Sequence, residues 1–321
     1  MPIVLITGGH TGIGFQCAER LACHHRKDLI LAGRSMERMK PAAEKLRSYG
    51  VKVWTIQLDT SSMRSVRVAS EIVRDILSEH LCGTLQALIC NAGVSSSGPV
   101  SYSEDGYEKT FATNYLGHFL LTELLCDAIA PKGRILLVVS GTHDPDTMDG
   151  KMVGRAAEPD AFALAHDGKD GQKPLAGGRH YSTSKLCMVM MAYELHRRLR
   201  KSESHIASIA YDPGAIPETG LIRNLPLPLQ AFFRLPPVKW LVAHAGVTTG
   251  SLEFSGNRLA DIAVEKQYAD DSGKYLQSSN GRLIEARSSR VSYDGEKAQQ
   301  LWDQTKTLVK LTTEEEPQLL S

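Results

Sequence analysis

The stretch Thr7-Gly8-Gly9-His10-Thr11-Gly12-Ile13-Gly14 decides the fold of this 321-residue chain. It follows an apolar run, Ile3–Thr7, and opens a segment with helical periodicity, Gly12–His25. Glycines between a strand and a helix allow a tight turn and let the backbone approach a pyrophosphate, which the helix N-terminus attracts. The spacing G-x-x-x-G-x-G therefore predicts a dinucleotide site that includes Gly8, His10, Thr11, Gly12, Ile13 and Gly14.

The rest of the chain continues the alternation of short apolar runs with longer amphipathic segments. This alternation indicates β-α-β units, so we expect a Rossmann-type, doubly wound α/β fold with helices on both faces of a parallel sheet, as a single domain over residues 1–321. The predicted strands, about seven, are Ile3–Thr7, Leu29–Gly33, Val53–Asp59, Ala87–Asn91, Arg134–Val139, His205–Tyr211 and Lys274–Gln277. The predicted helices are Gly12–His25, Ser35–Tyr49, Ser62–Leu77, Gly106–Ala130, Tyr181–Arg200 and Tyr293–Leu311.

Two segments interrupt this alternation. Residues 141–179 are rich in Gly, Asp and Pro, and a loop of this length inside a compact domain is usually functional or involved in assembly. Residues 215–250 combine prolines with large apolar residues and follow the sixth strand, where an open α/β sheet places its ligand crevice. We expect them to form a lid over an apolar small-molecule substrate. The alternatives are a membrane-surface patch and ordinary core packing.

Composition excludes several classes of partner and site. The net charge of +1 gives no reason to expect nucleic acid or an anionic surface as partner. The six cysteines form no C-x-x-C pair and no metal-ligand spacing, which suggests a reducing, cytoplasmic environment and no metal. No apolar stretch is long enough to cross a bilayer, so we expect no integral membrane segment. We expect His24 and His25 to interact with a helix dipole rather than with a metal.

The end of the second strand predicts which dinucleotide is bound. An acidic residue there suits a free ribose 2′-hydroxyl, whereas a cation suits a 2′-phosphate. Arg34 occupies this position and Arg38 lies one turn further on, which favours NADP(H) over NAD(H). The alternative is that Arg34 is a solvated loop residue. Asp59 follows the third strand and could accept a hydrogen bond from the adenine amino group.

Tyr181 and Lys185 lie one helical turn apart, so both side chains are on the same helix face. An ammonium beside a phenol lowers the pKa of the phenol, which makes it a usable proton donor and acceptor near neutral pH. The pair alone is weak evidence, because both residue types are common on solvated helix faces.

Taken together, these residues resemble the short-chain dehydrogenase/reductase family over nearly the whole chain, from about residue 3 to about residue 310. The motifs occur in the order of that family and at the expected strand ends. They are Thr7–Gly14, Asp59, Asn91-Ala92-Gly93, Asn114, Ser140, Tyr181 with Lys185, and Pro213-Gly214.

The resemblance implies a role for each of these residues. Tyr181 would be the acid or base that exchanges a proton with the carbonyl or alcohol oxygen. Lys185 would lower the pKa of Tyr181 and bind the nicotinamide ribose, and Ser140 would hydrogen-bond the reacting oxygen. Asn114 would hold a water in the proton relay. The cofactor would be lined by Asn91, Ala92, Gly93, Pro213, Gly214, Ile216 and, at the carboxamide, Thr219.

Within the family, the chain most resembles light-dependent protochlorophyllide reductases and their bacterial relatives, and retinol dehydrogenases less closely. The resemblance lies in Asn114–Phe119, the 141–179 insertion, Ala215–Leu221 and Glu296–Trp302. Ala215 stands where those reductases carry a cysteine, which argues against photochemical reduction of a double bond. We therefore expect an NADP(H)-dependent reductase of a ketone or enone on a fairly large apolar substrate. The alternatives are reduction of a ring double bond in a tetrapyrrole-like pigment and a cofactor-binding regulator without turnover.

The same resemblance bears on assembly. Many family members dimerise or tetramerise through the Y-x-x-x-K helix and the long helix before it. An insertion before Tyr181 can cover that surface, so we expect a monomer rather than a homodimer.

Overall fold

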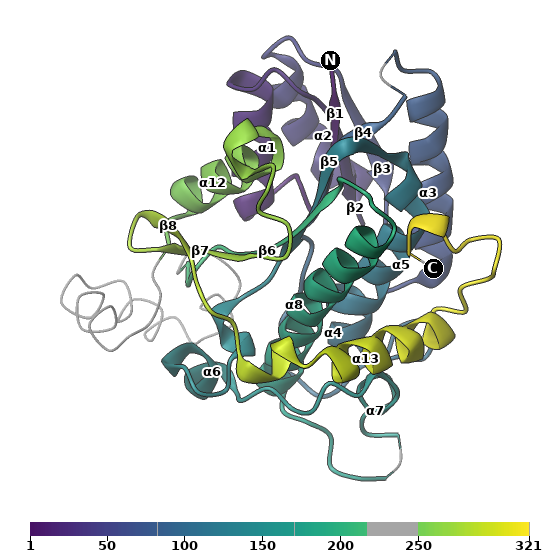
Figure 1. Ribbon diagram of the computed structural model, residues 1–321, viewed down its shortest axis with the longest axis vertical. Helices are drawn as coiled ribbons and strands as arrows, with labels where there is room; N and C mark the ends of the chain where they lie inside the picture. The colour runs from purple at the N-terminus through teal and green to yellow at the C-terminus, as the bar shows by residue number, and fades with distance from the viewer. Residues whose placement is uncertain (82, 170, 217–249, 321) are drawn as a thin grey trace.

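The central feature of the computed structural model is one eight-stranded sheet with the order β3-β2-β1-β4-β5-β6-β7-β8 (Figure 1). The structure describes residues 1–81, 83–169, 171–216 and 250–320. Strands β1 to β7 are parallel, and β8 pairs antiparallel with β7. The strands are β1 (Ile3–Thr7), β2 (Asp28–Gly33), β3 (Val53–Gln57), β4 (Leu85–Cys90), β5 (Ile129–Val138), β6 (Ala207–Asp212), β7 (Tyr275–Ser279) and β8 (Arg282–Glu285).

Helices cover both faces of the sheet, which confirms the predicted doubly wound fold (Figure 1). One face packs against α1 (Gly12–Cys23), α2 (Met36–Arg47) and α12 (Leu252–Val264). The other packs against α3 (Met63–Ser78), α5 (Gly117–Leu125), α8 (Gly177–Lys201) and α13 (Gly295–Leu308). Every residue of β1, β2 and β6 is buried, as expected for apolar strands covered on both faces.

The order in which the chain adds strands to the sheet changes after β3. The chain builds β1, β2 and β3 outward on one side, then returns to place β4 on the other side of β1. In an open α/β sheet, the crevice at such a switch point, outside the carboxyl ends of the strands, is where ligands bind. The phosphate-loop motif at the end of β1 lies at this point.

The predicted helix Gly106–Ala130 is divided in the structure. It consists of α4 (Lys109–Phe111), a π-helical turn η1 (Ala112–Leu116), α5 and a 3-10 turn η2 (Cys126–Ala128). The π turn contains Asn114, and such turns are frequent at functional sites. The strand β5 then begins at Ile129 rather than at the predicted Arg134.

Other differences lie where the sequence pattern is weak. The insertion 141–179 contains a 3-10 turn η3 (Gly141–His143) and two short helices, α6 (Met148–Val153) and α7 (Ala161–Ala165). The helix α8 begins at Gly177 rather than at Tyr181, although glycine is a poor helix former. A Cβ at Gly177 would lie 1.8 Å from the Ser96 carbonyl oxygen, so close backbone packing requires glycine there. The remaining 3-10 turns are η4 (Lys266–Tyr268), η5 (Arg290–Tyr293) and η6 (Gln318–Leu320).

The C-terminal helix α13 packs across α5 and α8. The Trp302 ring meets the Phe119 ring edge-on with centroids 4.8 Å apart, and the Arg198 guanidinium lies 4.7 Å from the Trp302 ring centre. The Thr305 hydroxyl lies 3.1 Å from the Tyr115 phenol oxygen. These contacts cover the two helices that the family resemblance associates with dimerisation.

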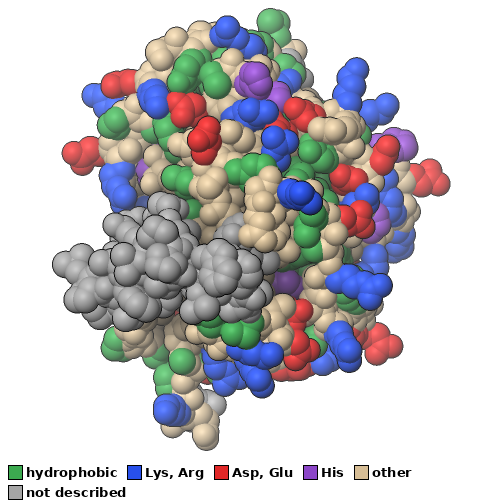
Figure 2. All heavy atoms as spheres, turned by 90° about the vertical axis from the view of Figure 1, so that its left-hand side faces the viewer, with side chains coloured by type: hydrophobic (Ala, Val, Ile, Leu, Met, Phe, Trp, Pro, Cys, Tyr) green, Lys and Arg blue, Asp and Glu red, His purple; other side chains and the backbone are tan. Residues whose placement is uncertain are grey.

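The surface shows no gathering of one charge on the face in Figure 2, where Lys and Arg side chains are interspersed with Asp and Glu. Among the helices that the structure describes, none combines the length and the apolar character needed to cross a bilayer.

Glu123 on α5 is a buried carboxyl group under α13. It is 1% exposed, and neither of its side-chain oxygens has a hydrogen-bond partner among the described residues. Burial raises the pKa of Glu123 to about 8, and Glu316 adds to the shift, while Lys306 and Arg198 partly offset it. The folded protein therefore holds this proton more tightly than the unfolded chain does.

This burial makes stability depend on pH. The contribution of Glu123 to the free energy of unfolding is fully present below its unfolded pKa, near 4.5. This contribution is lost as pH rises through about 8, the pKa in the folded protein. We expect Glu123→Gln, which cannot ionise, to melt at a higher temperature than the wild type at about pH 9, with a smaller difference at about pH 5. Thermal melts across this range measure the effect. Glu71→Gln, on the exposed side of α3, is the control, and a pH-independent difference for Glu123→Gln would contradict the account.

Candidate active site

The phosphate loop between β1 and α1 has the geometry of an anion cradle. Gly8 and Gly12 have φ angles of 68° and 59°, which favour glycine. A Cβ at Gly14 would lie 2.6 Å from the Gly8 carbonyl oxygen, whereas one at Gly12 would meet none of the described atoms within 4 Å. Thr11, the N-cap of α1, makes no side-chain capping hydrogen bond. The first N–H groups of α1 thus have no side-chain cap, and this cradle fits a dinucleotide pyrophosphate.

Thr7 fastens this loop to the end of β4. Its hydroxyl oxygen accepts hydrogen bonds from the N–H groups of Asn91 and Ala92, both at 2.9 Å. The Asn91 amide in turn donates to the Thr7 carbonyl oxygen at 2.9 Å. The structure therefore brings the predicted motifs after β1 and β4 together as one unit.

Three basic side chains meet at the carboxyl end of β2. Arg34 and Arg38 are exposed, and His10 is half-buried beside Gly33, whose Cβ would lie 3.2 Å from the imidazole. Burial lowers the pKa of His10, and the charges of Arg38 and Arg34 lower it further. The buried His10 Nδ1 has no hydrogen-bond partner within the described part of the chain. This orphaned nitrogen and the two guanidinium groups fit a phosphate monoester at this end of the cradle.

Asp59 forms the turn that leads into α3. Its Oδ1 accepts hydrogen bonds from the backbone N–H of Ser61 at 2.9 Å and from the Ser61 hydroxyl at 2.7 Å. Its own N–H donates to the Ser65 hydroxyl at 3.0 Å. One carboxylate oxygen is thus engaged in local structure, and a contact with adenine stays a prediction.

Asn114 joins the loop after β4 to α8. Its Oδ1 accepts from the Val94 N–H at 2.8 Å, and its Nδ2 donates to the Val94 carbonyl and the Ser184 hydroxyl, both at 2.9 Å. A Cβ at Gly93 would lie 3.4 Å from Asn114 Oδ1 and 3.6 Å from Lys185 Nζ. Asn114, Gly93 and Lys185 are therefore neighbours, and the water that the resemblance places at Asn114 stays a prediction.

His118 is a residue of this network that the sequence pattern did not reveal. Its Nδ1 lies 2.9 Å from the Asn114 carbonyl oxygen, and its Nε2 lies 2.9 Å from the Thr7 hydroxyl. Since a carbonyl only accepts, Nδ1 carries the proton and Nε2 accepts from Thr7. Burial lowers the pKa of His118 to about 4, so the ring is neutral at physiological pH. The only available signal was its position four residues after Asn114, on the same helical face.

Ser140 lies just past β5 and close enough to the Tyr181 phenol to lower the pKa of Tyr181 in part. The Ser140 hydroxyl oxygen accepts from the Thr142 N–H at 3.4 Å and from the Thr142 hydroxyl at 3.2 Å. Below it, His143 Nδ1 donates to the Ser140 carbonyl at 2.8 Å, while its Nε2 accepts from the Ser289 N–H at 3.1 Å. Because Thr142 donates to the hydroxyl oxygen, the Ser140 proton is available to an oxygen beside Tyr181.

In this structure the pKa of Tyr181 is raised, whereas the neighbouring Lys185 was expected to lower it. Burial raises the pKa of Tyr181 to about 12, Asp212 raises it further, and Ser140 opposes them. The Lys185 ammonium donates to the Val138 carbonyl at 2.7 Å and lies 5.8 Å from the Tyr181 ring centre. The pKa of Lys185 is itself lowered to about 8 by burial, an effect that Asp212 partly offsets. For both Tyr181 and Lys185, the loss of hydration on burial therefore shifts the pKa more than the neighbouring charges do.

The segment after β6 supplies the last predicted residues. Gly214 has a φ of 74°, and its N–H donates to Asp212 Oδ1 at 2.9 Å. Pro213 and Ile216 are buried next to this turn. Thr219 and residues 217–249 of the predicted lid lie outside the described residues. Asp212 was also not predicted, although a polar residue ending a buried strand, directly before Pro213-Gly214, was a signal.

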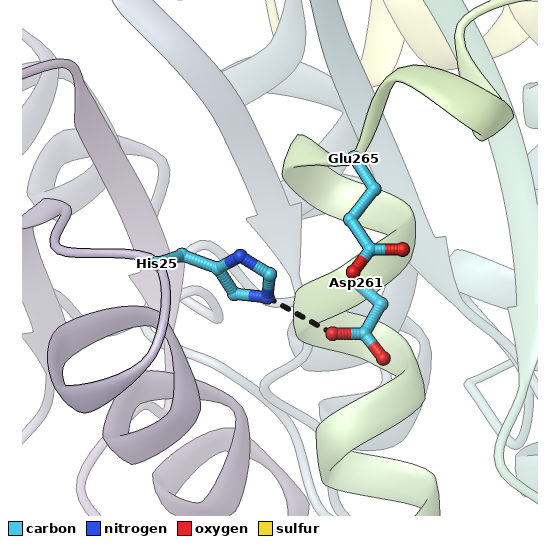
Figure 3. A group of neighbouring side chains, drawn as sticks. All are labelled: His25, Asp261 and Glu265. Carbon is cyan, nitrogen blue, oxygen red and sulfur yellow. Dashed lines mark hydrogen bonds and ion pairs between the residues drawn. The ribbon is translucent and has the colours of Figure 1, made fainter.

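One cluster of side chains away from these motifs could by its spacing hold a cation. His25, Asp261 and Glu265 lie together between the end of α1 and α12 (Figure 3). Asp261 Oδ1, however, is bonded to His25 at 2.9 Å and to Arg20 at 2.5 Å, and Arg258 lies 3.2 Å from Oδ2. Two guanidinium groups already balance this carboxylate, so His25 braces the packing of α1 on α12.

Known proteins similar to this chain include dehydrogenases and reductases. Residues 2–146 match the family model described as short chain dehydrogenase. A protochlorophyllide reductase of Daucus carota chloroplasts is 31% identical over 96% of this chain and 78% of its own length. A solved structure of an uncharacterised protein from Mycobacterium paratuberculosis has a TM-score of 0.70 at 25% identity, covering 97% of this chain and 94% of the other. A blue fluorescent protein from a metagenomic library, solved with NADPH, has a TM-score of 0.63 at 21% identity, covering 87% and 97%.

Proposed function

Because this chain belongs to the short-chain dehydrogenase/reductase family, we propose that it is an NADP(H)-dependent reductase of a ketone or enone on a fairly large apolar substrate. The observation that carries the proposal is that Ser140 and Lys185 are both neighbours of Tyr181, with the Lys185 ammonium 5.8 Å from the Tyr181 ring centre. Bound NADPH would supply the hydride, and the residues of the chain orient the carbonyl and provide the proton.

Tyr181 has the properties of a proton donor. With its pKa raised to about 12, the phenol is protonated at neutral pH, and this is the form that a carbonyl reduction requires. The Ser140 hydroxyl would donate to the same carbonyl oxygen and hold it beside Tyr181. The cation of Lys185 favours the phenolate that forms after proton transfer. The proton that the carbonyl oxygen gains would thus come from Tyr181.

The basic end of the cradle supports NADP(H) as the cofactor. Arg34 and Arg38 would bind the 2′-phosphate, and the unpartnered His10 Nδ1 would face the same group. Gly12, Ile13 and the N-terminus of α1 would hold the pyrophosphate. Asn91, Ala92 and Gly93 would line the path toward Tyr181. Among structures of similar fold, the metagenomic blue fluorescent protein was solved with NADPH.

Reduction of a carbon–carbon double bond is the second candidate. It is favoured by the similarity to protochlorophyllide reductases, such as that of Daucus carota. It is disfavoured by Ala215, which stands where the resemblance leads us to expect a cysteine. A light-dependent spectral change on mixing the protein with protochlorophyllide and NADPH would favour this second reaction over carbonyl reduction.

The proton donor can be tested by removing one oxygen atom. We expect Tyr181→Phe to lower turnover at least about 100-fold, because a general acid contributes that much, while the Kd for NADPH stays within about threefold. NADPH oxidation in a panel of ketones and enones measures turnover, and fluorescence titration measures binding. Tyr293→Phe, at an exposed phenol, is the control. Turnover by Tyr181→Phe at the wild-type rate would contradict the proposal.

Cofactor choice can be tested at Arg34. A charge-assisted hydrogen bond to a phosphate corresponds to about 10- to 100-fold in affinity, so Arg34→Asp should weaken NADPH binding by that factor and leave NADH binding nearly unchanged. Arg64→Asp, on the exposed side of α3, should change neither. Equal affinity of the wild type for NADPH and NADH would refute the role of Arg34.

We further propose that the protein is a monomer. Every residue of α5 is buried, and α8 is covered by α13 and by the turns η5 and η6. A dimer built on these helices would have to displace Trp302 from Phe119. Light scattering should therefore give the mass of one chain over a wide concentration range, and a stable mass of two chains would contradict this.

A further inference from the structure

Asp212 is a buried carboxylate at the candidate site that none of the proposed roles uses. It is the last residue of β6 and is 1% exposed. Three donors hold it: the Gly214 N–H on Oδ1 at 2.9 Å, and the Tyr275 phenol at 2.8 Å and Gln277 Nε2 at 2.7 Å on Oδ2. All three donors are neutral, so no hydrogen-bond partner in this set cancels a negative charge.

The direction of this carboxylate follows from strand alternation. Tyr211 points toward α12, where its phenol donates to the Ser255 carbonyl at 2.8 Å, so Asp212 points to the opposite face, where α8 lies. Tyr211 also pairs with Val138 on β5, whose carbonyl accepts from Lys185. Asp212 therefore lies on the same face of the sheet as the buried ammonium of Lys185, and its charge favours the protonated forms of Lys185 and Tyr181.

The sheet order indicates which part of the cofactor lies near Asp212, given the proposed function. The pyrophosphate cradle is at the end of β1, and Arg34, which would take the 2′-phosphate, is at the end of β2. The order β2-β1-β4-β5-β6 then sends the other end of a dinucleotide across β4 toward β5 and β6. Under the proposed function, Ser140 and Tyr181 hold the oxygen of the substrate carbonyl, so the carbonyl would lie at these residues, after β5. The residues at the ends of β5 and β6 would therefore hold the nicotinamide end of the cofactor.

We propose that Asp212 balances the charge of Lys185 and gives the site a preference for the cationic, oxidised nicotinamide over the neutral, reduced one. Bound NADPH would supply the hydride to the carbonyl carbon and be left with a positive ring, while Tyr181 would give its proton to the carbonyl oxygen. The carboxylate of Asp212 would stabilise the positive charge of the oxidised ring, so that NADPH would be a stronger hydride donor when bound than when free. Without Asp212, the buried ammonium of Lys185 would repel that charge.

The size of the effect follows from Coulomb's law. One unit charge within about 10 Å, at an effective dielectric constant near 20, changes a binding constant by about tenfold. The reduced ring is neutral, so only the oxidised cofactor feels this attraction. The ratio of the Kd for NADP⁺ to the Kd for NADPH therefore isolates the contribution of Asp212 and needs no knowledge of the substrate.

The test measures both dissociation constants for four proteins by calorimetry and fluorescence titration. We expect Asp212→Asn to raise the ratio of the Kd for NADP⁺ to that for NADPH about tenfold. Gln277 is half-buried and already donates to Asp212. In Gln277→Lys, the lysine ammonium would keep a donor to Asp212 and balance the negative charge of its carboxylate. This variant should therefore also raise the ratio of the two Kd values. Tyr275→Phe is the matched control, because it removes a donor and leaves the carboxylate, and its ratio should stay within about twofold of the wild type.

The outcomes separate this inference from the proposed function. Ratios within about twofold of the wild type in folded Asp212→Asn and Gln277→Lys would overturn the role of Asp212 alone. If Asp212→Asn shows no cooperative thermal transition, and so is not folded, the ratio measured for Gln277→Lys alone tests the role of Asp212. A folded wild-type protein that binds neither dinucleotide would refute the proposed function, and the role of Asp212 with it.

Discussion

The candidate site depends on the hydroxyl group of Thr7. It accepts the N–H groups of Asn91 and Ala92 and donates to His118, which in turn donates to the Asn114 carbonyl. Thr7, His118 and Asn114 are fully buried, and an unpaired polar atom in such a place costs about 1–3 kcal/mol. One hydroxyl therefore fixes the phosphate loop, the end of β4 and the π turn relative to one another. The cradle for the anion and the residues around Lys185 are positioned by the same set of bonds.

Burial controls the ionisation of the site more than neighbouring charges do. It holds the pKa of Tyr181 near 12 and brings that of Lys185 down to about 8. A protonated phenol beside a cation whose charge is only partly compensated suits proton donation to a carbonyl. Asp212 is the described carboxylate placed to complete that compensation, which is why we assign it a part in the energetics of hydride transfer.

The sequence predicted those features that depend on local pattern. Strands such as Ile3–Thr7 are almost entirely apolar because helices cover both faces of the sheet. The glycines at 8, 12 and 14 are recognisable in the sequence because their positive φ angles or close packing require glycine. Features set by tertiary contacts were missed. The π turn at Asn114 depends on Val94 and His118, and the pKa of Tyr181 depends on its burial. The strand β8 is mostly exposed and pairs only with β7, so its residues carry no clear alternation. The helix α12 follows residues 215–250, which have no periodicity to anchor a prediction.

The most direct test of the account is a crystal structure of the protein with NADPH. The account predicts the 2′-phosphate at Arg34 and Arg38, the pyrophosphate on the N-terminus of α1, and the nicotinamide between Tyr181 and Asp212 at the ends of β5 and β6. A nicotinamide placed away from Tyr181, or a 2′-phosphate away from Arg34, would contradict it.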